Sequence, residues 1–284
     1  MHPLEAVLLG IVQGLTEFLP VSSTAHLTLA GKALSLVDER DPAAWTAFIA
    51  VMQLGTLAAV VLYFRRDLLS MGRALGAALR PGTLRGPGAS LRPEARLALL
   101  VLLGTLPVAA AGLALSDLIH GMFTKNTLVI VASLVGLALL LWLAEKKAVH
   151  RRNLEDLRAR DALFIGLAQA LALIPGASRS GTTITAGLFA GLERPAAARF
   201  SFLLSVPAVF ASGLFEMLAI DPAVFRLGLG NLALATVVSC AAGYAAIAWL
   251  LRFLSTHSTM VFVWYRIGLG ALLLLLLWGG FFKG

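Results

Sequence analysis

The sequence has few charged residues, one cysteine and no basic residue near its start. Only 13% of its 284 residues are charged, whereas soluble domains carry about 25%. The lone thiol of Cys240 excludes an intrachain disulfide. No lysine or arginine precedes the first apolar segment and no Ala-x-Ala site follows it, so we expect no cleaved signal peptide. The rest is strongly apolar, with 59% hydrophobic residues and a mean hydropathy of +0.87, which predicts a multi-pass membrane protein.

Six apolar runs are long enough to cross a membrane, which takes about 20 helical residues. They lie at roughly 46–64, 97–115, 127–144, 200–220, 231–251 and 260–279. Two further apolar segments, 5–30 and 162–190, are interrupted at 20–24 and 175–180. A break inside a bilayer must satisfy its backbone groups against protein or a water-filled cavity. We therefore expect an all-α membrane protein with six transmembrane helices and two re-entrant helical hairpins.

The two interrupted segments resemble each other. GIVQ at 10–13 matches GLAQ at 166–169, and a proline and then a serine cluster follow each. The order hairpin, span, span, span thus occurs twice, in 1–146 and in 147–284, within one membrane domain. An odd number of spans reverses the orientation of the second copy, which predicts an inverted-topology repeat.

The basic residues gather between particular spans. Of the 23 lysines and arginines, 16 fall in four segments, namely 65–96, 145–161, 191–199 and 252–258. This is the positive-inside pattern of membrane proteins, so the net charge of +8 indicates topology and not nucleic-acid binding. The pattern predicts that both termini lie outside, that one hairpin enters from each face, and that the hairpin tips meet near the midplane.

Polar side chains gather at the two breaks, although polar groups inside a bilayer are costly and tend to mark a site. They are Gln13, Glu17, Ser22, Ser23, Thr24, His26, Ser178, Arg179, Ser180, Thr182 and Thr183. The arginine offers a planar fork that suits phosphate. Each break also begins a new half-helix, whose free N–H groups and positive dipole end favour anions. Together these features predict a phosphate site.

Three residues near the first break suggest a cation site and a proton carrier. Glu17 and Gln13 lie one turn apart on one helix face, and magnesium binds one or two carboxylates together with waters and phosphate oxygens. His26 can exchange a proton near neutral pH. A simpler interpretation stays open, in which Glu17 and Arg179 only form a buried salt bridge. Arg266 is expected to extend its charge to the membrane interface.

At these residues the sequence resembles the undecaprenyl-diphosphate phosphatase family, the bacitracin-resistance type of membrane enzyme. The resemblance rests on QGLTEFLPVSSTAH, from Gln13 to His26, and on PGASRSGTT, from Pro175 to Thr183, and it covers essentially the whole chain. It implies hydrolysis of undecaprenyl diphosphate to inorganic phosphate and undecaprenyl phosphate, the lipid carrier for peptidoglycan precursors. It also implies a divalent cation and a site near the outer face of the bacterial inner membrane. The family uses Glu or Gln at the place of Gln13, so this position need not supply charge.

By the same resemblance, the functional positions are Glu17, Ser23, His26, Ser178 and Arg179. We expect catalysis from Glu17, Ser23 and His26, and a cation, magnesium or alternatively calcium, on Glu17 and Gln13. The residues expected to bind the substrate phosphates are Arg179, Ser178, Ser180, Thr183, Ser22 and Thr24. The expected partners are a polyprenyl diphosphate lipid and membrane lipid, without nucleic acid. A homodimer is left open.

The attacking group and the class of protein each have alternatives. Ser23 is the favoured nucleophile, with His26 or Glu17 taking its proton. His26 itself could attack instead, or a cation-bound water could attack with His26 as base. A transporter or flippase for a polyprenyl phosphate could use the same inverted repeat and anion donors. Such a carrier would not need the proton-transfer group formed by Glu17, Ser23 and His26.

Overall fold

The computed structural model describes residues 1–36, 42–80, 91–115, 126–218 and 228–280. Within these ranges the chain is helical, and its one β-bridge pairs Arg152 with Leu192. The long helices are α3 (Pro42–Tyr63), α5 (Pro93–Ala114), α7 (Thr127–Lys147), α10 (Arg194–Leu218), α11 (Leu229–Leu254) and α12 (Met260–Trp278). The shorter elements are α1 (Pro3–Phe18), α2 (Ser23–Ala33), α4 (Arg65–Ala78), η2 (Leu154–Asp156), α8 (Ala159–Ala170), η3 (Leu171–Leu173) and α9 (Arg179–Phe189).

The described helices include five that are long and apolar enough to cross a membrane. These are α5, α7, α11, α12 and the part of α10 from Arg194 to Gly213. A sixth span arises if α3 and α4 count as one, although the chain bends by 74° between them. Each of the six predicted apolar runs therefore contains a long helix, and the multi-pass membrane character is confirmed. Helix α4 was not predicted, because its first residues, Arg65 and Arg66, belong to a segment that the charge pattern marked as a loop.

Both interrupted segments are broken in the structure where the prolines predict it. Pro20 lies between α1 and α2, and Pro175 lies between η3 and α9. Ser22 and Ser178 follow with φ of 74° and 69° and cap the new helices. Residues other than glycine rarely adopt such a left-handed conformation. In each case the serine Oγ accepts a hydrogen bond from the N–H three residues on, which helps to hold it.

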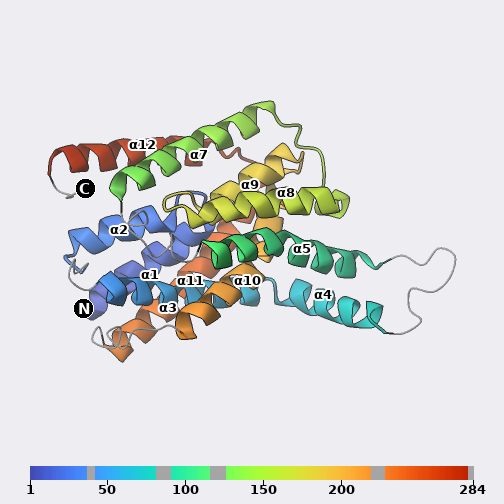
Figure 1. Cartoon of the computed structure of the whole chain (residues 1–284), viewed down its shortest axis with the longest axis horizontal. Helices are drawn as coiled ribbons and strands as arrows, with labels where there is room; N and C mark the ends of the chain where they lie inside the picture. Colours follow the sequence, from blue (N-terminus) through green and yellow to red (C-terminus); the bar gives the residue numbers. More distant parts are fainter. Residues whose placement is uncertain (37–41, 81–90, 116–125, 219–227, 281–284) are drawn as a thin grey trace.

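Helices of one half of the chain pack on helices of the other half, and each of these contacts has a counterpart in which the two halves are exchanged (Figure 1). Helix α1 packs against α11 while α8 packs against α5, and α3 packs against α11 while α10 packs against α5. Helices α7 and α12, one from each half, pair with each other. Small residues permit the closest approaches. A Cβ on Gly166 of α8 would lie 2.2 Å from the carbonyl oxygen of Gly104 on α5, and one on Gly10 of α1 would lie 2.6 Å from that of Ala235 on α11.

The largest cluster of buried apolar residues lies beside the break between α1 and α2. Phe18, the last residue of α1, packs edge-to-face on Phe202 of α10, with 5.4 Å between the ring centroids. Phe64, at the bend between α3 and α4, is buried in the same cluster. The end of α1 is therefore fixed by aromatic packing, and Glu17 is the residue just before this anchor.

The basic helix α4 lies at one end of the molecule. The N-terminus and the last turn of α12 lie at the other end (Figure 1). Ion pairs of Arg194 with Glu145 and of Arg199 with Asp67 join the basic segments to one another. The separation of the N-terminus from the basic helix α4 is the arrangement that the charge pattern of the sequence predicts.

Candidate functional site

Glu17, in the last turn of α1, is the carboxylate around which the site forms. Its Oε2 accepts hydrogen bonds from Gln13 Nε2 at 3.1 Å and from Ser23 Oγ at 2.8 Å. Its Oε1 accepts one from Arg179 Nη2, also at 3.1 Å. The Glu17 side chain is only 8% exposed. Three donors from α1, α2 and α9 therefore meet at one buried carboxylate, although Arg179 lies 162 positions away in the sequence.

Several polar atoms at this carboxylate have no partner among the described residues. Arg179 uses only Nη2, and its buried Nε and Nη1 atoms are unpartnered. The Oε1 atom of Gln13 is buried and unpartnered as well. A buried donor without an acceptor is costly, by about 1–3 kcal/mol. Nε and Nη1 lie on different edges of the guanidinium, so each can donate separately to a phosphate oxygen, and the arrangement can bind this anion.

Serines at the start of α9 connect the two breaks. Ser180 Oγ donates a 3.0 Å hydrogen bond to the carbonyl oxygen of Leu19, in the other break. Ser178 Oγ lies 3.2 Å from Ser180 Oγ and also caps α9. The first N–H groups of a helix have no partner within it. Ser23 and Arg179, the first residues of α2 and α9, both donate to Glu17, so the two helix starts meet at this carboxylate.

The threonines predicted at the site lie in different environments. Thr183 Oγ1 is fully buried, donates to the carbonyl oxygen of Arg179 at 2.8 Å and lies 2.6 Å from Ser201 Oγ on α10. Thr182 Oγ1 donates to the same carbonyl at 2.9 Å. Both hydroxyls thus hold the first turn of α9 in place. Thr24 of α2 is exposed, and the structure gives its side chain no hydrogen bond to a described residue.

His26 is bound through both ring nitrogens. Its Nδ1 lies 2.7 Å from the carbonyl oxygen of Ser22, and its Nε2 lies 2.6 Å from the hydroxyl of Tyr265 on α12. A carbonyl only accepts, so Nδ1 carries the proton, and in the neutral ring Nε2 accepts from the tyrosine. Sequence reasoning missed Tyr265. A tyrosine just before the intramembrane Arg266 was the available signal.

The oxygen atoms available as ligands at Glu17 and Gln13 suit a hard divalent cation. The free Oε1 of Gln13 and the remaining lone pair of the Glu17 carboxylate are oxygen ligands one helical turn apart. Among the described residues, no three histidine, cysteine or acidic side chains come together. Magnesium needs few protein ligands where waters and phosphate oxygens complete its shell. The two residues can therefore hold such an ion only together with a substrate phosphate.

The sequence of this chain also matches known proteins. The family described as bacitracin resistance protein BacA matches residues 6–272. This chain belongs to that family. It is 54% identical over 280 residues to the undecaprenyl-diphosphatase of Myxococcus xanthus (strain DK1622), covering 99% of this chain and 91% of that protein. It is 50% identical to the undecaprenyl-diphosphatase of Syntrophobacter fumaroxidans, over 96% of this chain and 97% of the relative.

A third relative, the undecaprenyl-diphosphatase of Chlorobium luteolum, is 47% identical over 99% of both chains. The resemblance that the two motifs indicated is therefore confirmed along nearly the full length. Every site residue from Gln13 to Thr183 lies within the matched BacA region.

The expectation for Arg266 is wrong in this BacA chain. Its side chain does not reach the interface but is fully buried. Nε donates to the carbonyl oxygen of Leu134 at 3.0 Å, and Nη2 donates to those of Ala177 at 3.0 Å and Gly176 at 3.4 Å. Nη1 reaches that of Pro20 at 3.5 Å. Broken helices leave carbonyl groups without helical partners, and these provide acceptors in the interior that a hydropathy pattern cannot reveal.

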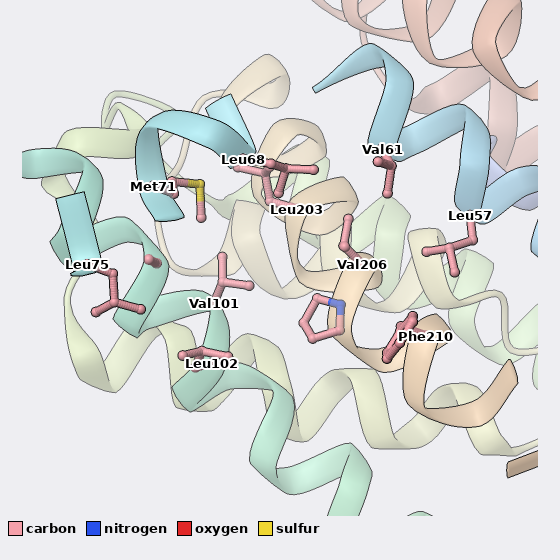
Figure 2. A pocket seen from close by; sticks show the side chains of 12 residues that line it. Leu57, Val61, Leu68, Met71, Leu75, Val101, Leu102, Leu203, Val206 and Phe210 are labelled. Atoms are coloured by element: carbon pink, nitrogen blue, oxygen red, sulfur yellow. The ribbon is translucent and has the colours of Figure 1, made fainter. Parts of the chain in front are cut away.

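A separate groove on the BacA chain has a different character. Figure 2 shows it between α3, α4, α5 and α10, with a volume of about 320 Å³. It is lined by Leu57, Val61, Leu68, Met71, Leu75, Ala98, Val101, Leu102, Leu203, Val206, Pro207 and Phe210. None of these side chains can donate a strong hydrogen bond, so the groove cannot bind a phosphate.

Proposed function

We propose that this chain is an undecaprenyl-diphosphatase, which hydrolyses undecaprenyl diphosphate to undecaprenyl phosphate and inorganic phosphate. The observation that carries the proposal is the pair of unpartnered guanidinium donors of Arg179 beside a serine hydroxyl bonded to Glu17. This combination offers both a phosphate clamp and an activated nucleophile. The names of the BacA relatives agree with it.

Ser23 is the proposed nucleophile. Its Oγ attacks the terminal phosphorus, the bond from that phosphorus to the bridging oxygen breaks, and undecaprenyl phosphate leaves. The proton of the hydroxyl passes to Glu17, whose Oε2 already accepts it as a hydrogen bond at 2.8 Å. Arg179 and the N–H groups at the helix starts stabilise the charge on the phosphoryl oxygens. His26 is less suited to attack, because both of its ring nitrogens have partners.

Water then hydrolyses the phosphoserine and restores the hydroxyl. His26 lies three residues after Ser23 on α2, so both are on one helix face. We assign His26 to this second step, in which its Nε2 accepts the proton of the water and Tyr265 yields its place on that nitrogen. A cation-bound water as the direct attacking group is the alternative route.

A divalent cation, magnesium or alternatively calcium, belongs to this proposal. Glu17 and Gln13 would hold it together with phosphate oxygens, where it supplies charge neutralisation to the transferring phosphoryl group. The residues that bind phosphate in this proposal are Arg179, Ser178, Ser180, Thr183, Ser22 and Thr24. Of these, Arg179 offers the free donors, whereas Ser180 and Thr183 chiefly position the helix starts.

The finer architecture is also proposed. Residues 1–146 and 147–284 form an inverted-topology repeat of one re-entrant hairpin and three spans each. The exchange of packing partners between the halves supports this arrangement. We place the protein in the bacterial inner membrane, with both termini outside and the site open toward the outer face, on the strength of the charge pattern.

Release of inorganic phosphate by the purified protein in detergent tests the function. Detergent leaves no second compartment, so a carrier without phosphatase chemistry would release none. We expect turnover that falls at least about a hundredfold in Ser23→Ala and is lost in excess chelator. The exposed-site control Ser255→Ala should match the wild type. Absence of release by the wild type would overturn the proposal, and turnover by Ser23→Ala would favour the water route.

A further inference from the structure

Arg266 is a buried cation that the proposed chemistry does not use. It lies within α12, its side chain is fully buried, and none of the ion pairs among the described residues includes it. A buried charge without a counterion is costly unless hydrogen bonds satisfy it. All its hydrogen bonds go to backbone carbonyl groups, so the location of these groups indicates what the residue does.

The carbonyl groups bound by Arg266 occupy equivalent places in the two breaks. Pro20 lies two residues before the helix cap Ser22, and Gly176 lies two residues before the helix cap Ser178. Nη1 of the guanidinium contacts the first of these carbonyl groups, and Nη2 contacts the second. One rigid, planar group therefore joins both breaks.

A glycine provides the space for this guanidinium. Gly181 is the third residue of α9, as Ala25 is the third residue of α2, and the N–H of each donates to its cap serine. A Cβ on Gly181 would lie 2.6 Å from Nη1 of Arg266. The second break thus has a glycine where the first has an alanine, because the arginine fills the volume of a side chain there.

We propose that Arg266 is the positioning residue of the phosphate site. It fixes the two helix starts relative to each other, so that Ser23 of α2 and Arg179 of α9 address the same diphosphate. This inference rests on the proposed site, since it assigns a purpose to the spacing of those two side chains. Arg266 does not touch the substrate, because its hydrogen-bond donors are directed to carbonyl groups in the interior.

The role predicts a particular kinetic effect. If the helix starts shift, the serine and the arginine lose the alignment that the transition state requires, and a misplacement of about 1 Å can cost on the order of a hundredfold in rate. Binding of the substrate depends less on this alignment, because Arg179 and the helix N–H groups remain. A positioning role therefore lowers kcat more than it raises KM.

Two substitutions test the positioning role, one at Arg266 and one at Gly181, the residue that its guanidinium packs against. Arg266→Lys keeps the charge but cannot join carbonyl groups of both breaks, and Gly181→Ala displaces the guanidinium without removing it. For each we expect kcat to fall by about tenfold or more while KM changes less than about threefold. The matched control is Gly268→Ala on α12, where no heavy atom lies within 4 Å of the added methyl group. Its kcat should equal that of the wild type.

The double variant Gly181→Ala with Arg266→Lys shows whether the two act through one contact. We expect its kcat to be no lower than that of Arg266→Lys alone, because the added methyl group then meets no guanidinium. Losses that multiply would overturn the inference. So would a kcat within twofold of the wild type in folded Arg266→Lys, or an effect confined to KM. If Arg266→Lys does not fold, an unchanged kcat in Gly181→Ala overturns it.

The same assay separates this inference from the proposed function. Arg179→Lys and Ser23→Ala address the site itself, without altering the contacts of Arg266. If both keep full turnover, the proposed site is wrong whatever the Arg266 variants do. If both are inactive while Arg266→Lys and Gly181→Ala behave as the wild type, only the positioning role fails.

Discussion

At the scale of single residues, three hydrogen-bond donors converge on the Glu17 carboxylate, and one of them, Arg179, has further N–H groups that this contact does not use. A salt bridge whose only role was structural would satisfy the guanidinium of Arg179, because unpartnered buried donors are costly. Instead, two of its three nitrogens are buried and have no partner in the described parts of the chain. The ion pair with Glu17 at 3.1 Å therefore leaves Arg179 able to bind a phosphate. We therefore interpret the salt bridge as part of the proposed phosphate site.

Tyr265→Phe tests the environment of His26. The change removes one hydroxyl, which donates to Nε2 at 2.6 Å, and preserves the ring. Tyr265 leaves Nε2 before His26 accepts a proton, so this hydrogen bond, worth about 1 kcal/mol, stabilises only the resting state, and we expect kcat to rise by up to about fivefold with little change in KM. Steady-state kinetics of phosphate release measures it. Tyr244→Phe, on an exposed ring of α11, is the control and should be unaffected. Equal kcat in the two variants would remove Tyr265 from the site.

At the scale of elements, proline and serine patterns predicted the breaks, while charge obscured one helix. Pro20 and Pro175 cannot continue a helix, and the serines after them are good caps, so both breaks could be inferred from local sequence. Helix α4 was missed because its arginines indicated a loop. The partners of Tyr265 and the true place of Arg266 could not be predicted, because these partners come from distant segments. Local patterns cannot show which carbonyl groups a side chain will meet.

The carboxylate of Asp161, at the start of α8, should make the stability of the folded chain depend on pH. Burial raises the pKa of Asp161, but hydrogen bonds from Arg152 and from the N–H of Arg158 outweigh it, and the pKa lies below its ordinary value. Such a carboxylate stabilises the folded chain above its ordinary pKa, and this contribution is lost as the pH falls through the lowered pKa. The unfolding temperature of Asp161→Asn in detergent should therefore be lower than that of the wild type at pH 7.

The difference between Asp161→Asn and the wild type should vanish as the carboxyl is protonated in strong acid. Glu155→Gln, at an exposed site in η2, serves as the control and should follow the wild type across the range. A gap in unfolding temperature that stays constant with pH would show that the charge of Asp161 has no such role.

At the scale of the whole molecule, the contacts of one half recur in the other with the partners exchanged. The short helices α1 and α8 each press against the second span of the opposite half, at Gly10 and Gly166. The sequence predicted two similar halves from matching motifs. It could not predict which spans would meet, because the small apolar residues at these contacts are common throughout the chain. The site depends on this packing, since it brings α1 and α9 together.

Gly166→Ala tests the packing of α8 on α5. The added Cβ would lie 2.2 Å from the carbonyl oxygen of Gly104, so the helices must separate. We expect a loss of about 1–3 kcal/mol in the free energy of unfolding, which is typical of overpacking. Gly136→Ala on α7 is the control, because no heavy atom lies within 4 Å of its added methyl group. Thermal unfolding of the two purified variants measures the effect, and equal unfolding temperatures would contradict the close approach.

The most direct test of the central claim is turnover by Arg179→Lys in detergent, measured as phosphate release. Lysine keeps the charge but lacks the planar guanidinium, whose Nε and Nη1 are unpartnered among the described residues. We predict a fall in turnover of about a hundredfold or more, at an unfolding temperature close to that of the wild type. The exposed Arg66→Lys should turn over normally. Turnover by Arg179→Lys near that of the wild type would show that the two breaks do not form one phosphate site.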